Sequence, residues 1–254
     1  MRSRHPRTRP LHRLYAAALL LCAPGALAEE GARGSSLAPA DTPDLEIRKA
    51  DVTYLEDLDL LVFEQRVKGR AGATAPEARG AIDGAPVLGY VFPTTLEPAD
   101  IGFGAGSGTV ALAVTSHPDF DDTPLWDENN DRRYDNDGIV FHSHWVVLVA
   151  DPSAPGGLAV EKLPPDAPQG TLPPTNPGMP MLLDSPGFSI VLRGDTLRVL
   201  VPAQRVNHHT SFKFDAVTAY MEVSTASGSP SLRVHRTYSV LSGDLSLPFV
   251  VRRE

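Results

Sequence analysis

The sequence is almost without cysteine, because its 254 residues include only one, Cys22. This residue lies in an N-terminal segment that we expect to be removed, so an intramolecular disulfide is excluded in the mature chain. Stability must therefore come from core packing, to which a bound metal can add. The apolar fraction of 42% is ordinary for a globular domain and excludes a disordered or fibrous chain.

Long apolar runs are also lacking, and the run from Leu14 to Cys22 is too short to anchor a chain in a bilayer, which takes roughly 20 residues. Five arginines precede this run, and the sequence Ala26-Leu27-Ala28 follows it. This order is typical of a cleaved signal peptide, here residues 1–28. We expect an exported protein, periplasmic or extracellular, without a transmembrane anchor and a candidate component of the cell envelope.

Positive charge is scarce once residues 1–28 are removed. The remaining chain has 18 Lys and Arg against 31 acids, a net charge of −13. Such a chain is repelled by a phosphate backbone, so nucleic acid is excluded as a partner and divalent cations are favoured.

Amphipathic helices of three or more turns are lacking as well, and short segments rich in β-branched and aromatic residues take their place. After a flexible N-terminus at residues 29–43, the pattern predicts one domain over residues 44–254, an all-β antiparallel β-sandwich of about ten strands. A connection with ten prolines, residues 151–187, is expected to cross the surface as irregular chain, with a short strand at 158–163. The expected strands are 45–52, 60–67, 87–92, 109–115, 139–149, 189–192, 197–201, 212–223, 232–241 and 247–251, and Arg193-Gly194-Asp195-Thr196 predicts a hairpin turn.

Two of these segments, Leu60–Gly69 (LLVFEQRVKG) and Leu197–Pro202 (LRVLVP), together with the acidic turn before the first, carry a resemblance. Their order is similar to the strand pattern of secreted DOMON-like and family 9 carbohydrate-binding-module-like β-sandwiches. The resemblance implies the sandwich fold and, because members of that superfamily bind sugars or haem, a carbohydrate partner.

An acidic stretch separates two of the predicted strands, with eight acids and two arginines between Asp119 and Asp137. Its oxygen side chains alternate and close on Gly138, an arrangement that suits the six to eight oxygen ligands of Ca²⁺. The stretch resembles the calcium loops of EF-hand-like and thrombospondin type 3 repeats, although Arg132 and Gly138 replace the EF-hand glycine and glutamate. The alternative is a solvated acidic loop. The candidate calcium ligands are Asp127, Asn129, Asp131, Asp135 and Asp137.

Histidines form the second candidate site. His142 and His144 lie two residues apart in a predicted strand, so both side chains leave the same face. The strand that ends before His117 is expected to pair with the strand that carries His142 and His144. In that case His117 and either Asp119 or Asp121 complete a three-His-one-carboxylate site for Zn²⁺, Cu²⁺ or Fe²⁺. The alternative is that these histidines are hydrogen-bond donors and counter-charges to the acidic stretch.

Aromatic side chains flank the acidic stretch, and Trp126, Tyr134 and Trp145 could stack on a sugar ring. No nucleophile-elbow, zinc-protease or nucleotide-binding motif occurs, so no catalytic residue is predicted. The leading hypothesis is an exported binding protein that holds a divalent metal, calcium first, and an unidentified ligand. Its alternatives are a transition-metal hydrolase or oxygenase built on His117, His142 and His144, and a carbohydrate-binding module.

Overall fold

The structure is a computed structural model of the chain, and it describes residues 38–77, 82–104, 106–118, 131–133 and 140–254. Strands dominate these residues, and the helical turns among them are short 3-10 turns, so the predicted all-β class is confirmed. No helix in the described ranges has the length and apolarity needed to span a membrane. The strands are β1 (Ile47–Leu55), β2 (Leu60–Val67), β3 (Pro86–Pro93), β4 (Thr109–Ser116), β5 (His142–Ala150), β6 (Leu158–Val160), β7 (Leu183–Asp184), β8 (Ser189–Arg193), β9 (Thr196–Pro202), β10 (Lys213–Phe214), β11 (Val217–Ser224), β12 (Ser231–Val240), β13 (Phe249–Val250) and β14 (Arg252–Arg253), and the 3-10 turns are η1 (Pro43–Leu45), η2 (Glu56–Leu58), η3 (Pro98–Ile101) and η5 (Ala203–Val206).

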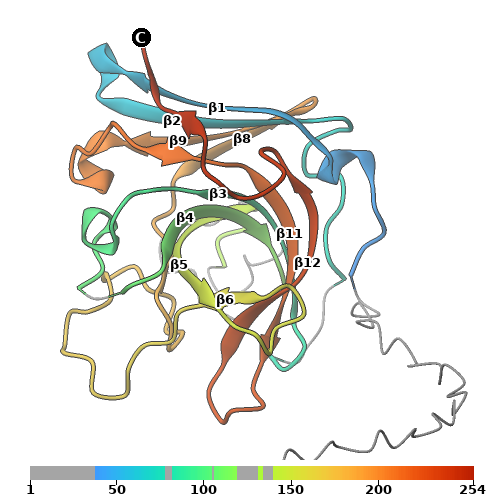
Figure 1. The fold of residues 1–254 in the computed structure, drawn as a ribbon, viewed down its shortest axis with the longest axis vertical. Helices are drawn as coiled ribbons and strands as arrows, with labels where there is room; N and C mark the ends of the chain where they lie inside the picture. The colour runs from blue at the N-terminus through green and yellow to red at the C-terminus, as the bar shows by residue number, and fades with distance from the viewer. Residues whose placement is uncertain (1–37, 78–81, 105, 119–130, 134–139) are drawn as a thin grey trace, which may run out of the picture. The chain divides into compact units, whose positions relative to one another are not determined.

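Six strands form a closed barrel, whose ring of ribbons is visible in Figure 1. The strands pair in the order β4-β3-β11-β12-β6-β5, and a further antiparallel ladder between β4 and β5 joins the two ends. That ladder runs from the pair Thr109 and Leu148 to the pair Thr115 and His142. The short strand β7 adds to β5 next to β6.

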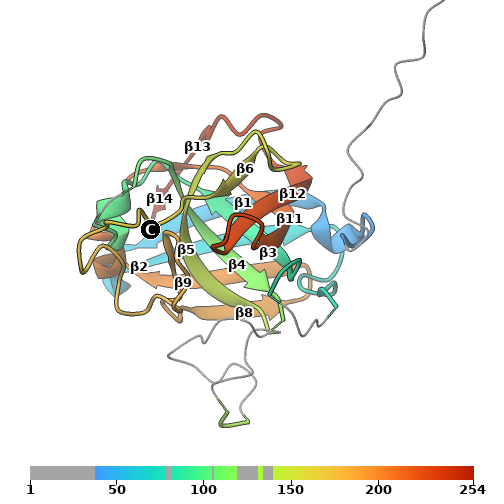
Figure 2. The ribbon, with the colours of Figure 1, turned by 90° about the horizontal axis from the view of Figure 1, so that it is seen from below.

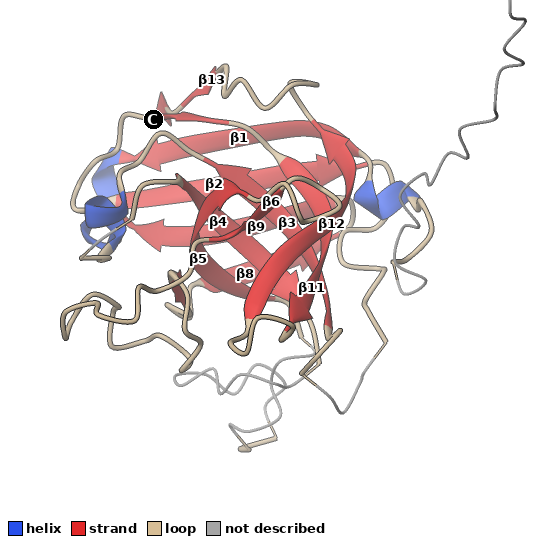
Figure 3. Ribbon diagram, turned by 60° about the horizontal axis from the view of Figure 1, so that its bottom comes forward, coloured by secondary structure: helices blue, strands red, loops and turns tan. Residues whose placement is uncertain are grey.

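A five-stranded sheet in the order β14-β1-β2-β9-β8 packs against the barrel, and Figures 2 and 3 show the barrel strands in front of it. Its strands are antiparallel, except that β1 and β14 are parallel. The predicted turn between β8 and β9 is confirmed, because Arg193 pairs with Thr196 and Gly194 adopts a positive φ of 61°. This conformation suits glycine, which has no Cβ.

The strands of the barrel wall bury side chains on both faces, so they contribute to two large cores, beside a smaller cluster of Leu45, Leu88 and Tyr220. On β5, Trp145 and Val147 point outward into the core shared with the five-stranded sheet, where Phe63 of β2 is also buried. The alternate residues of the wall, such as Val146 of β5 and Met221 of β11, point into the barrel. Because successive side chains of a strand leave opposite faces, one strand can serve two cores.

The open sandwich of about ten strands is not confirmed, although the predicted strands are largely in place. Closure depends on β6, which pairs with both β5 and β12 and bridges the gap between them. β6 confirms part of the short strand predicted at 158–163, but the rest of this proline-rich segment does not simply cross the surface as predicted. Its residues Met181 and Leu182 are instead buried, with 0% exposure each. The proline-rich connection is therefore partly a piece of the barrel wall.

Candidate metal centre

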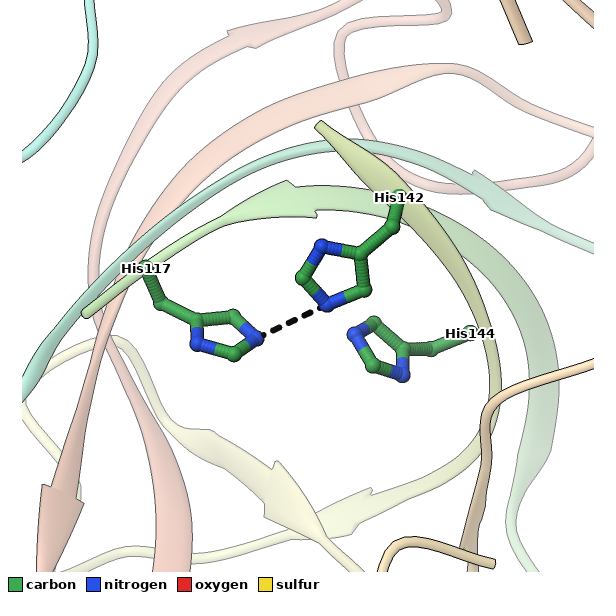
Figure 4. Close-up of side chains that lie close together, drawn as sticks. All are labelled: His117, His142 and His144. Atoms are coloured by element: carbon green, nitrogen blue, oxygen red, sulfur yellow. Dashed lines mark hydrogen bonds between the residues drawn. The ribbon is translucent and has the colours of Figure 1, made fainter. Parts of the chain in front are cut away.

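Three histidines gather at one end of the barrel, and they come from the β4–β5 ladder. His142 and His144 lie on β5, and His117 follows directly after β4. The register pairs Thr115 with His142, so the strand alternation that carries Thr115 into the barrel carries His117 there too. The predicted convergence of these three side chains is confirmed, and Figure 4 shows their rings facing one shared space.

The three rings are close enough to share one ion. The Nε2 atoms of His117 and His142 are 3.0 Å apart, and one ligand atom from each of the three histidines lies within 4.8 Å of the others. Around a tetrahedral zinc ion with Zn–N bonds of 2.0–2.1 Å, ligand nitrogens are about 3.3 Å apart. Small rotations of the rings would therefore bring all three nitrogens to coordination distance. The side chains are shielded from solvent, since each residue is only 2–3% exposed.

Backbone carbonyls fix the protonation of two rings. The Nδ1 atom of His117 lies 2.8 Å from the carbonyl oxygen of Pro118, and that of His142 lies 2.7 Å from the carbonyl oxygen of Val140. A carbonyl oxygen only accepts, so each Nδ1 must carry the hydrogen and each Nε2 of a neutral ring presents a lone pair. This is the usual arrangement of metal-binding histidines, whose second nitrogen donates to a carbonyl or carboxylate.

His144 is held by the segment around β7. Its Nδ1 lies 2.9 Å from the hydroxyl of Ser185, and the ring also bonds to the backbone of Asp184. The carboxylate of Asp184 in turn accepts a 2.5 Å hydrogen bond from Thr175. The proline-rich connection thus orients the third histidine, with Nε2 left facing the other two rings (Figure 4).

Burial keeps His117 and His144 neutral. It lowers the pKa of His117 to about 4, against a weaker opposing effect of its bond to Pro118. Burial also holds the pKa of His144 well below its usual value, and the neighbouring His142 and His117 lower it further. Neutral imidazoles are the form that binds metal, so these two rings need not lose a proton near neutral pH. Both Nδ1 atoms face carbonyl oxygens, so the 3.0 Å hydrogen bond between the two Nε2 atoms of His117 and His142 requires a second proton on one ring, and a cation can take the place of that proton.

The candidate calcium ligands fall mostly outside the described residues, so the calcium site stays a prediction. Asp131 is described, and it is exposed, with its side chain accepting a hydrogen bond from the backbone of Arg133. The candidates outside the described residues are Asp127, Asn129, Asp135 and Asp137, together with the carboxylates Asp119 and Asp121 and the aromatics Trp126 and Tyr134.

Trp145 does not fit its predicted role at a sugar-binding surface. The side chain is 1% exposed and meets Phe63 and Phe188 edge-on, with ring centroids 6.3 and 6.4 Å away. Strand alternation explains this position: His144 points into the barrel, so Trp145 must point out of it. The indole packs the outer core and is not available to a sugar ring.

Sequence reasoning missed two side chains at the site, Ser185 and Thr115. Nothing in the proline-rich connection singles out Ser185, because its place beside His144 depends on β7 pairing with β5. The alternation of side chains along the strand could have identified Thr115, because it precedes His117 by two residues and lies on the same strand face.

Removing the Ser185 hydroxyl tests its part in orienting His144. We expect Ser185→Ala to weaken Zn²⁺ binding by about 10–100-fold, the usual effect of losing a group that holds a ligand. The metal-free protein should lose only about 0.5–1.5 kcal/mol of unfolding free energy, the value of one hydrogen bond. Competition with a chromophoric chelator measures the affinity, with the exposed Ser227→Ala as control. Equal affinities in Ser185→Ala and the wild type would contradict the assignment.

Comparison of the chain with protein-family models, with curated proteins and with solved structures finds no match.

Proposed function

We propose that the protein binds one divalent transition-metal ion, zinc foremost, through His117, His142 and His144. The observation that carries this proposal is the convergence of three buried ring nitrogens whose partner nitrogens are already hydrogen-bonded to the protein. Burying three imidazole rings together costs desolvation, with no gain in packing that an aliphatic side chain would not supply better.

The donor set favours a transition metal over calcium. Imidazole nitrogen suits zinc, copper, iron and nickel, whereas calcium takes six to eight oxygens. Three protein ligands also leave one position of a tetrahedral ion open, as in catalytic rather than structural zinc sites. An ion of this kind can polarise a bound oxygen or activate water. The arrangement thus supports a metal centre that receives a ligand from outside the protein.

The proposed centre and the predicted calcium loop can be separated in one experiment. The protein is purified without added metal, analysed for bound elements, stripped with EDTA and titrated with Co²⁺ or Zn²⁺ in millimolar Ca²⁺. We expect one transition-metal ion per chain, and a Co²⁺ absorption spectrum typical of a four-coordinate ion with three nitrogen ligands. An oxygen site would lose its ion to the excess calcium, whereas three imidazoles would not. A chain that retains calcium alone would overturn the proposal.

Export of the mature protein is a further part of the proposal, and it rests on the N-terminal pattern of residues 1–28. Sequencing the N-terminus of protein recovered from the periplasm or medium tests it, with Glu29 expected as the first residue. Recovery of the intact chain in the cytoplasm alone would contradict export and leave the metal centre unaffected.

A further inference from the structure

The barrel interior contains a cavity of about 190 Å³, and side chains from all six wall strands line it. Most of the lining is aliphatic or methionine, as at Val146, Met181 and Met221. Asp, Glu, Lys and Arg are absent from the lining that the structure describes. A molecule held here must therefore be largely apolar, because charged or multiply hydroxylated groups would find few partners along these walls.

The ring nitrogens that line the cavity lie at the metal centre, and two further polar lining residues, Thr109 and Thr237, come from β4 and β12. His117 and His144 line the end at the metal centre, and Thr115 lies beside them, paired in register with His142. The Thr115 hydroxyl oxygen is buried and has no hydrogen-bond partner among the described residues. A buried hydroxyl without a partner costs free energy, so this atom points to a ligand oxygen next to the ion.

Charge narrows the choice of that ligand. A divalent ion held by three neutral imidazoles keeps its full double charge in an apolar enclosure, where uncompensated charge is expensive. A carboxylate would offset part of this charge, complete the coordination and accept a hydrogen bond from Thr115. A neutral alcohol or ketone would leave the charge in place.

We take the opposite end of the barrel, beyond the last residue of β12, as the entrance to the cavity. Leu245 lines the cavity there and is also 36% exposed. Leu245 and Leu247, which also lines the cavity, have positive φ angles of 59° and 52°. This conformation is strained for leucine, so the fold must hold both residues in it. A molecule that enters past these leucines meets the metal with its leading group.

We infer that the barrel binds a small apolar carboxylate, with its head group on the metal and its hydrocarbon part in the cavity. This inference rests on the proposed metal centre. The size follows from the volume, because a cavity of about 150 Å³ lined by aliphatic and aromatic side chains accepts benzene. A single aromatic ring with one carboxylate, or an aliphatic chain of similar volume, therefore fits.

The test uses the Co²⁺-loaded full-length mature protein and three probes: benzoate, acetate and toluene. Benzoate combines the head group and the ring, whereas acetate and toluene each supply only one of them. We expect benzoate to shift the Co²⁺ visible absorption and to bind at least tenfold more tightly than acetate, because burial of the ring adds hydrophobic free energy. Toluene should leave the spectrum unchanged.

Two variants assign the binding to this cavity. Ala219→Leu fills the interior and should weaken benzoate at least tenfold while acetate and Co²⁺ bind as before; Ala219→Val replaces it if the larger side chain prevents folding. Thr115→Val removes the hydroxyl at constant shape and should weaken both carboxylates by about three- to tenfold. If Co²⁺ does not bind, the metal centre and the ligand inference both fail. If Co²⁺ binds but benzoate binds no better than acetate, or resists Ala219→Leu, only the ligand inference fails.

Discussion

Replacing His144 with alanine is expected to abolish stoichiometric binding of Zn²⁺ or Co²⁺. His144 supplies one of the three ligands. Losing a group that only supports a ligand weakens metal binding by about 10–100-fold, and losing the ligand itself should weaken it more. The wild type at a zinc concentration of 100 times Kd should gain about 2.7 kcal/mol of stability. For a domain of this size that gain raises the melting temperature by about 5–10 °C, and His144→Ala should show no rise.

A matched control separates this effect from loss of any histidine. His209 is exposed and pairs with Asp100 at 2.5 Å, far along the chain from β5, so His209→Ala should bind zinc as the wild type does. His144→Gln keeps more of the side-chain volume and should also lose the ion. Loss of the ion in both variants would show that the effect does not come from unfolding of His144→Ala. Tight one-to-one zinc binding by a folded His144→Gln protein would contradict the assigned site.

Replacing Phe63 with alanine should cause the largest loss of stability among the changes considered. The ring is 0% exposed and lies between the sheet and the barrel, with ring centroids 5.3 Å from Phe92, 6.0 Å from Phe212 and 6.3 Å from Trp145. Removing a buried phenyl ring costs about 3–5 kcal/mol, because the cavity it leaves closes only partly. The melting temperature should fall by about 6–20 °C in a thermal scan of the metal-free protein.

The exposed Leu58→Ala serves as the control, since that side chain is 62% exposed and should change stability by no more than about 0.5 kcal/mol. A loss below about 1 kcal/mol in Phe63→Ala would mean that the aromatic contacts do not hold the sheet on the barrel. Zinc affinity should change little in this variant, because Phe63 packs on the outer face of the barrel wall and not on the interior face.

Much of the strand pattern was predictable, because it depends on local alternation and turn residues. The expected strand 60–67 matches β2 throughout, and the expected strand 109–115 differs from β4 by one residue. Closure of the barrel was not predictable, because it depends on which strand edges pair with each other. β6 is only three residues long, yet it joins β5 to β12, and no local pattern shows that pairing.

Part of the candidate site was likewise predictable from the sequence, and part was not. His142 and His144 were predictable from their spacing on one strand, and His117 from the assumption that neighbouring strands in the chain pair. The cavity behind them was not predictable, because continuous apolar strands look alike whether they enclose a filled core or an empty one. Ser185 was not predictable for a related reason, since it reaches His144 only through the pairing of β7 with β5.

The β4–β5 ladder also bears on the order of events during folding. All three histidines belong to one hairpin, whereas the barrel wall is completed only by pairs distant in sequence, such as Leu88 with Tyr220. Pairings between nearby segments lose less loop-closure entropy and form earlier than distant ones. The ligands therefore assemble on an open, still solvated hairpin, where an ion can be captured before β11 and β12 enclose it. The metal available during folding would then be the first ion that the protein carries, and exchange with other ions through the finished barrel would follow more slowly.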